Sequence, residues 1–186
     1  MTICSQDINP QDVIQFWFDE ITPKQWWIKD QDFDQLLVDR YQRLLESAVK
    51  GELFSWRETL LGRLAEIIVL DQFSRNIYRD DARAFAADPV ALVLSQEVVR
   101  KQRYDGLSSN QIQFLLMPYM HSESLLIHEE AVKLFDKPGL EGNLDFEYKH
   151  KVIIERFGRY PHRNDILGRD STVEERAFLL EPGSSF

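Results

Sequence analysis

Helix start signals recur along nearly the whole chain, whereas the alternating pattern of a β-strand is almost absent. Asn9-Pro10, Asp88-Pro89 and either Ser108 or Ser109 precede apolar residues that are spaced three and four apart, and this combination of cap and periodicity begins an amphipathic helix. No segment alternates polar and apolar residues between Asn-Gly or Asp-Gly turns, so β-hairpins are not expected. The sequence therefore predicts an all-α fold of about eight helices.

Other signals place the remaining helix boundaries. They predict a helix from Asp30 or Asp32 to Gly51, and a long helix from the capping box Ser55–Glu58 to about Ile77. Pro118 predicts a kink or a restart. A further helix runs from Asn143 to Gly158, and the capping box Ser171–Glu174 begins the last helix. Short loops between successive helices favour antiparallel neighbours. Because no linker or low-complexity tract interrupts the chain, we expect residues 1–186 to form a single domain.

The charge balance narrows the classes of partner. The 186 residues include 22 Lys and Arg against 31 Asp and Glu, a net charge of −9. An acidic chain is poorly suited to nucleic acid, and no apolar run approaches the roughly 20 residues of a membrane span. The one cysteine, Cys4, allows no internal disulfide, and the N-terminus lacks the pattern of a secretory signal. We therefore expect a cytoplasmic protein that binds neither nucleic acid nor membrane; its oligomeric state is open.

A helix that is apolar on most sides carries polar residues in its C-terminal half. Leu64 and Ile68 belong to an apolar face, and continuing this face along residues 70–79 reaches polar side chains. Buried polar groups need partners, so we expect an interior polar cluster of Asp71, Gln72, Arg75 and Asn76, with Arg79 beside it. The alternative is that Asp71 and Arg75, four residues apart with the acid first, form an exposed helix pair.

An arginine-rich connector, RFGRYPHRNDILGR, occupies residues 156–169 between the last two predicted helices. It has four arginines and one aspartate, a formal charge of +3 in an acidic chain. Gly158, Pro161 and Gly168 predict a mostly irregular path, with one helical turn at Asp165–Leu167. A long connector inside a folded chain is more often functional than a short one.

The histidines differ in their sequence surroundings. His128 lies on an apolar stripe with Leu125 and Val132, and such a histidine is most often a satisfied core residue. His121 is followed at once by a hydroxyl and a carboxylate, and His150 precedes the connector by six residues. We therefore treat His121 and His150 as candidate site residues.

Three segments, LDQFSRNIYR (70–79), MPYMHSES (117–124) and HKVIIERFGRYPHRNDILGR (150–169), together resemble a bacterial family known as the domain of unknown function numbered nine-two-four. With FWF (16–18) and STVEERAFL (171–179), the resemblance covers about residues 10–181. It implies a TPR-like antiparallel array of helices and no reaction, because the activity of the family is unassigned. The polar positions of the family fall on Asp71, Gln72, Arg75, Asn76, Arg79, His121, Ser122, Glu123, His150, Arg156, Gly158, Arg159, Pro161, Arg163, Asn164 and Arg169. Departures from the family pattern at Asp19, Ser74, Asp80-Asp81 and Ser124 bear on specificity rather than on fold.

These groups favour a pocket for a small anionic metabolite, a phosphate or a carboxylate, that could serve a hydrolase or a transferase. The planar fork of arginine suits both anions, and a histidine can transfer a proton near neutral pH. The predicted catalytic residues are His121, Glu123, His150 and Asp71. The predicted ligand-binding residues are Gln72, Arg75, Asn76, Arg79, Ser122, Arg156, Arg159, His162, Arg163 and Asn164.

Two other interpretations stay open. A TPR-like groove lined by arginines could bind an acidic peptide or protein partner, or the arginines could neutralise internal carboxylates in a purely structural network. Glu147 and His150 form a single Glu-x-x-His pair without the second pair that a helical di-iron site needs. We therefore expect no metal and no cofactor.

Overall fold

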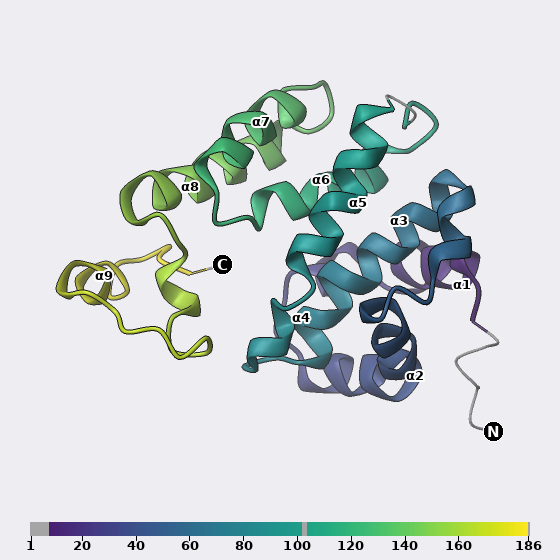
Figure 1. The fold of residues 1–186 in the computed structure, drawn as a ribbon, viewed down its shortest axis with the longest axis horizontal. Coiled ribbons are helices and arrows are strands. Elements are labelled where there is room, and N and C mark those ends of the chain that lie inside the picture. The colour runs from purple at the N-terminus through teal and green to yellow at the C-terminus, as the bar shows by residue number, and fades with distance from the viewer. Residues whose placement is uncertain (1–7, 102–103, 186) are drawn as a thin grey trace.

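The computed structural model describes residues 8–101 and 104–185, and these residues form helices and no strand (Figure 1). The α-helices are α1 (Pro10–Gln15), α2 (Gln31–Val49), α3 (Leu60–Ile68), α4 (Ser74–Ile77), α5 (Asp88–Arg100), α6 (Ser109–Met120), α7 (Leu125–Phe135), α8 (Glu141–Phe157) and α9 (Val173–Phe178). Two π-helical segments, Phe16–Glu20 and Val69–Phe73, extend α1 and join α3 to α4. The predicted all-α fold is confirmed, whereas the TPR-like arrangement and the single domain stay predictions. None of these helices is long and apolar enough to cross a membrane.

The helices form two groups in space. α3 packs against α1, α5 and α6, and α2 packs against α4 and the π-helical segment before it. α7 packs against α6 and α8. In Figure 1, α7, α8, α9 and the connector form a lobe to one side of α1–α6. The connector belongs to this lobe, and residues of the connector contact the group α1–α6.

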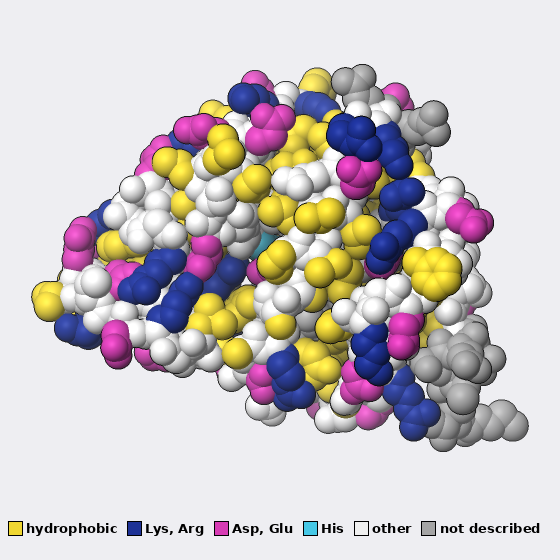
Figure 2. Space-filling view, viewed as in Figure 1, with side chains coloured by type: hydrophobic (Ala, Val, Ile, Leu, Met, Phe, Trp, Pro, Cys, Tyr) yellow, Lys and Arg dark blue, Asp and Glu magenta, His cyan; other side chains and the backbone are white. Residues whose placement is uncertain are grey.

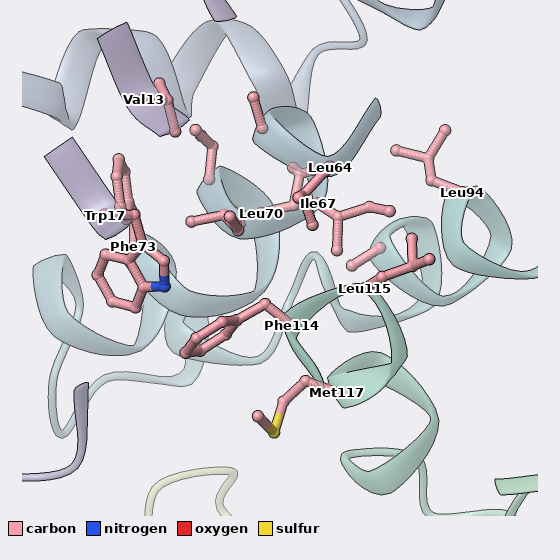
Figure 3. Close-up of a cluster of buried hydrophobic side chains, with 14 of the residues drawn as sticks. Val13, Trp17, Leu64, Ile67, Leu70, Phe73, Leu94, Phe114, Leu115 and Met117 are labelled. Atoms are coloured by element: carbon pink, nitrogen blue, oxygen red, sulfur yellow. The ribbon is translucent and has the colours of Figure 1, made fainter. Parts of the chain in front are cut away.

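The long helix 60–77, made of α3, the π-helical segment and α4, is the buried centre of the fold. Its residues 64–74 are buried without interruption. Figure 3 shows Phe73 of this helix beside Trp17, with ring centroids 5.5 Å apart. A helix that is buried on every side brings its polar residues inside with its apolar ones, and this places Asp71 in the interior.

Several predicted helix boundaries are confirmed. The side chains of Asn9, Asp30 and Ser108 cap α1, α2 and α6. Gly158 follows α8 in the left-handed conformation, with φ at +69°, where a side chain would be strained. Pro118 lies inside the last turn of α6, so the predicted kink or restart is the end of that helix.

Two predicted helix starts are wrong. Ser55 and Glu58 do not form a capping box, because residues 54–58 are a 3₁₀ helix and the side chain of Thr59 caps α3 instead. α8 begins at Glu141 rather than after Asn143.

The capping box of the last helix is displaced by one residue from its predicted position. Thr172 and Glu175 form it, rather than Ser171 and Glu174. The hydroxyl of Ser171 is already engaged, since it accepts a hydrogen bond from Nδ2 of Asn164 at 3.0 Å.

Candidate functional site

The C-terminal half of the long helix meets three other parts of the chain at a polar cluster. His121 after α6, Asp88 at the start of α5 and Arg163 in the connector converge on Asp71 and Arg75. We call these five residues the Asp71 cluster. Figure 2 shows a histidine surface in the hollow between the lobe of α7–α9 and the rest of the molecule, with basic and acidic side chains beside it.

Asp71 holds and orients His121. The carboxylate is fully buried, with Oδ1 2.7 Å from Nδ1 of His121 and Oδ2 accepting a hydrogen bond from Gln72 at 2.5 Å. Burial opposes the charge of Asp71, but Arg75 and His121 hold the pKa of its carboxyl well below the ordinary value. The carboxylate is therefore the acceptor, Nδ1 of His121 carries the proton, and Nε2 keeps a lone pair.

The second ring nitrogen of His121 is available for chemistry. Nε2 has no hydrogen-bond partner within the described part of the chain, and the side chain is 14% exposed. Burial and the charge of Arg75 lower the pKa of His121, so the ring is neutral at neutral pH. A buried carboxylate that orients a neutral histidine with one open nitrogen is the arrangement of a general base.

Arg75 is held by two aspartates. Its NH1 and NH2 each lie 2.9 Å from an oxygen of Asp88 in a two-point ion pair. NH1 also lies 3.2 Å from Oδ1 of Asp71 and donates to the backbone carbonyl of that residue at 2.6 Å. The side chains of Asp71 and Arg75 are 1% and 19% exposed, so the pair lies in the interior and not on the surface.

Arg163 is buried with much less compensation. Its side chain is 8% exposed, and NH1 lies 3.5 Å from Oδ2 of Asp88, an oxygen that Arg75 already binds. Nε of Arg163 is buried without a hydrogen-bond partner. The guanidinium lies 4.6 Å from the ring centroid of Phe85 and 4.5 Å from that of Tyr160. Burial and the charge of Arg75 lower the pKa of Arg163, but an arginine in a protein stays charged.

Two other arginines of the connector bind internal carboxylates. Nε and NH2 of Arg159 lie 2.6 and 2.8 Å from the two oxygens of Glu175. NH1 and NH2 of Arg169 lie 2.6 and 2.9 Å from the two oxygens of Glu123, which also accepts the backbone N–H of Tyr160. Arg159, predicted to bind a ligand, and Glu123, predicted to be catalytic, are thus each held in an internal ion pair.

Arg156 and Arg79 lie apart from the Asp71 cluster. Nε of Arg156 lies 2.9 Å from Glu174 at an exposed site. Nε and NH2 of Arg79 lie 2.5 and 2.7 Å from the carboxylate of Asp34 on α2, and NH2 also donates to Asn76 at 2.9 Å. Arg79 and Arg156 thus contact carboxylates outside the Asp71 cluster, Asn76 donates to the backbone carbonyl of Gln72, and their ligand-binding role stays a prediction.

Asn164 and Ser122 both form hydrogen bonds with other residues of the protein. Asn164 donates to Ser171 and accepts from Nε of Arg169 at 3.0 Å, which shapes the connector. The hydroxyl of Ser122 accepts a hydrogen bond from the backbone N–H of Ser124 at 3.2 Å, and its carbonyl accepts one from His128 at 2.8 Å. The predicted ligand-binding role of both residues stays a prediction.

His150 and His162 flank the Asp71 cluster. Burial lowers the pKa of His150 to about 3, and Nδ1 of that ring donates to the carbonyl of Phe146 at 2.8 Å. Burial and the charge of Arg163 lower the pKa of His162 to about 4. Rings that resist protonation this strongly are poor acid–base groups at neutral pH, so the position of His150 does not favour the predicted catalytic role.

His128 is a satisfied core residue, as predicted. It is fully buried, with Nδ1 2.6 Å from Glu147 and Nε2 2.8 Å from the carbonyl of Ser122, and the hydroxyl of Tyr160 lies 3.2 Å from Nε2. Glu147 is therefore a partner of His128. Across residues 8–101 and 104–185, no three His, Cys, Asp or Glu side chains are grouped so as to hold a metal ion.

Sequence reasoning missed three residues of this neighbourhood. Asp88 looks like the first residue of a helix beside Pro89, and nothing in its spacing indicates contact with an arginine. Phe85 and Tyr160 lie far apart in the sequence and carry no signal that they would enclose the same guanidinium. Only the three-dimensional packing brings them to Arg163.

Comparison with known proteins places the chain in a family. A family model described as bacterial protein of unknown function (DUF924) matches residues 13–183. The chain belongs to this family. Among solved structures, the DUF924 chain is similar to a protein of unknown function, ATU0120 from Agrobacterium tumefaciens, with 35% identity and a TM-score of 0.86 over 92% of this chain and 96% of that one. No curated protein matches the chain. Membership in DUF924 names no reaction, so function must be argued from the Asp71 cluster.

Proposed function

We propose that the protein binds a small anionic metabolite through its carboxylate or phosphate group at the Asp71 cluster, with Arg163 as the main contact. We propose further that His121 is the proton-transfer group of a hydrolase or transferase reaction at the same place. The observation that carries the proposal is the guanidinium of Arg163, which is 8% exposed and has a buried Nε without a hydrogen-bond partner.

The comparison of Arg163 with its neighbours supports a ligand. Arg159 and Arg169 each have two contacts to one carboxylate, all of 2.6 to 2.9 Å. Arg163 has one contact of 3.5 Å, and it shares that carboxylate with Arg75. A buried charge is costly unless it is paired and hydrogen-bonded. An anionic group bound in two-point fashion to NH1 and NH2 would balance this charge.

His121 supplies the chemical part of the proposal. Its Nε2 lone pair can accept a proton from a water or a hydroxyl group, and the carboxylate of Asp71, 2.7 Å from Nδ1, would stabilise the imidazolium that forms. The returning proton would then leave with the departing group of the substrate. The aspartate in this arrangement orients the ring and does not itself take the proton.

Binding of small anions to variants of Arg163 tests the proposal. We would titrate the wild-type protein and Arg163→Gln with propionate and with sulfate at constant ionic strength, and follow binding by NMR chemical shifts. The wild type is expected to bind at least one of these anions, and Arg163→Gln is expected to bind it at least about tenfold more weakly, as for the loss of a charge-assisted hydrogen bond.

Arg159→Gln is the matched control, because Arg159 lies on the same connector and its carboxylate partner is internal. This variant is expected to bind anions as the wild type does. Absence of binding in the wild type, or equal affinity in Arg163→Gln, would contradict the proposed function. Circular dichroism of each variant separates loss of binding from loss of fold.

A further inference from the structure

We propose that the Asp71 cluster takes up one proton from the solvent together with a singly charged anion, and that Nε2 of His121 accepts this proton. The inference rests on the proposed anion binding at Arg163. It adds the charge of the ligand and the way in which pH controls its affinity.

The fixed charges of the Asp71 cluster already cancel. Asp71 and Asp88 supply two negative charges, and Arg75 and Arg163 supply two positive charges, in ion pairs of 2.9 to 3.5 Å. An anion that enters this largely buried place therefore adds one uncompensated negative charge, which is costly away from water. A proton gained by a nearby neutral group restores the balance.

His121 is the group best placed to gain that proton. Its Nδ1–H already donates to the buried carboxylate of Asp71 at 2.7 Å, so a proton on Nε2 creates an imidazolium in contact with a fixed negative charge. In the free protein, burial and Arg75 oppose this charge and lower the pKa of His121. A bound anion beside Arg163 offsets the positive charge of the arginines, so the same pKa rises on binding.

The other groups that face His121 are less suited to the proton. Asp71 is engaged in the pair itself, and Asp88 is held by Arg75 through two contacts of 2.9 Å. His150 on α8 and His162 in the connector also interact electrostatically with His121. The hydrogen bond of His150 goes to a neutral backbone carbonyl, and the strongest charged neighbour of His162 is an arginine. Burial lowers the pKa of these two rings to about 3 and about 4, so both stay neutral near neutral pH.

Charge matching also selects the ligand class. With His121 protonated, the cluster carries one net positive charge, which a carboxylate monoanion neutralises. A dianion would leave one negative charge uncompensated at the same site. We therefore expect a carboxylate to bind more tightly than a dianionic sulfate or phosphate group of similar size.

The dependence of affinity on pH tests the inference. Propionate and sulfate keep their charges from about pH 6 to about pH 8, so a change in affinity over this range reports on the protein. Between the pKa values of His121 in the free and bound states, the Kd of propionate is expected to rise about tenfold for each pH unit. Calorimetry in two buffers that differ in their heat of ionisation is expected to show the uptake of one proton for each propionate bound.

His121→Gln and His150→Gln separate the inference from its rivals. His121→Gln is expected to bind propionate with the affinity that the wild type has at high pH, without pH dependence and without proton uptake. His150→Gln is expected to show the same pH dependence and the same proton uptake as the wild type. A Kd of the wild type that is constant over this range would overturn the inference, as would proton uptake that persists in His121→Gln. Tighter binding of sulfate than of propionate would overturn the selection of a single charge.

Failure of the proposed function gives a different result. In that case the wild type binds neither anion at any pH, or Arg163→Gln binds as the wild type does. Binding that depends on Arg163 but not on pH would leave the proposed function intact and overturn only the proton uptake.

Discussion

His121–Asp71 and His128–Glu147 are histidine–carboxylate pairs of nearly equal length. They differ in the hydrogen bonding of the second ring nitrogen of the histidine. Nδ1 of His121 lies 2.7 Å from Asp71, and Nδ1 of His128 lies 2.6 Å from Glu147. The second nitrogen of His128 is bonded to a backbone carbonyl, and both side chains of that pair are fully buried. The second nitrogen of His121 has no partner among the described residues. The distance within a pair thus says little about its role; what matters is whether the other nitrogen is already used.

The location of the proton also separates the two pairs. The carbonyl of Ser122 can only accept, so Nε2 of His128 carries a proton, and the short contact between Nδ1 and Glu147 needs one more. Burial raises the pKa of Glu147, which favours that proton on the carboxyl group. The pKa of Asp71 is lowered instead, mainly by Arg75 against the effect of burial, so the proton stays on His121. The pKa of the carboxyl group is therefore shifted in opposite directions in the two pairs, down in Asp71 and up in Glu147.

Removing His128, whose two ring nitrogens are both hydrogen-bonded, is expected to lower the free energy of unfolding the most. His128→Ala leaves the carboxyl group of Glu147 buried without its partner, which costs about 1–3 kcal/mol of unfolding free energy, and the cavity left by the lost ring adds to this cost. His121→Ala is expected to cost about 1–2 kcal/mol, because Asp71 keeps Arg75 and Gln72 as partners. Urea unfolding of both variants measures the difference, and equal losses would contradict the comparison.

Acid is expected to lower the free energy of unfolding through His150 and His162, which lie near Arg163. The pKa values of His150 and His162 are lowered from 6.5 to about 3 and about 4, so the unfolded chain binds more protons than the folded one between these values and 6.5. The stabilising contribution is therefore present above about pH 6.5 and is lost as the pH falls toward about 4. One pKa unit corresponds to about 1.4 kcal/mol, so the two rings account for a loss of several kcal/mol. Urea midpoints across this range should fall less steeply in His162→Gln, and an unchanged slope would count against the lowered pKa of His162.

Replacing two arginines of the connector, Arg169 and Arg163, is also expected to change the stability by different amounts. Arg169→Met leaves Glu123 half-buried and without its two-point partner, with an expected cost of about 1–3 kcal/mol. Arg163→Met removes a buried charge with weak compensation and keeps the packing between two rings, so the stability is expected to change by less than about 1 kcal/mol or to rise. Thermal unfolding compares the two variants, and a larger loss for Arg163→Met would assign Arg163 to the structural network.

Glu147→Gln is expected to have the smallest effect. The amide can donate a hydrogen bond to Nδ1 of His128, as the protonated carboxyl does, so the cost is expected to be below about 1 kcal/mol. Because the pKa of Glu147 is raised in the folded state, its contribution is present below pH 4.5 and is lost as the pH rises through the folded value. The variant should remove this part of the pH dependence. A loss as large as that of Glu147→Ala would show that the pair is an ion pair instead.

The sequence predicted the helices and the polar face of the central helix because these depend on local spacing. The caps at Asn9, Asp30 and Ser108 need only the residues beside them. The burial of Asp71 and Gln72 followed from the apolar residues that precede them on the long helix. His128 was recognisable as a core residue for the same reason.

The pairing of charges could not be predicted, because it is set by contacts between distant segments. Arg79 meets Asp34 across 45 positions, and Arg169 meets Glu123 across 46. A sequence with many arginines and many acids allows many such pairings, and their energies differ by little before packing selects one. Arg163 differs from Arg159 and Arg169 only through these distant pairings, which give the other two an internal carboxylate each.

The π-helical segment Val69–Phe73 has a consequence for the alignment of related chains. A π turn holds one residue more than an α turn, and the buried residues Asp71 and Gln72 lie within this segment. Every side chain from there to the end of the long helix is rotated by about 100° relative to an uninterrupted α-helix. A relative with a one-residue gap at this segment would keep the helix and the apolar core, but its counterpart of Arg75 would point to other neighbours. A gap at this segment would therefore identify relatives that share the fold but not the Asp71 cluster.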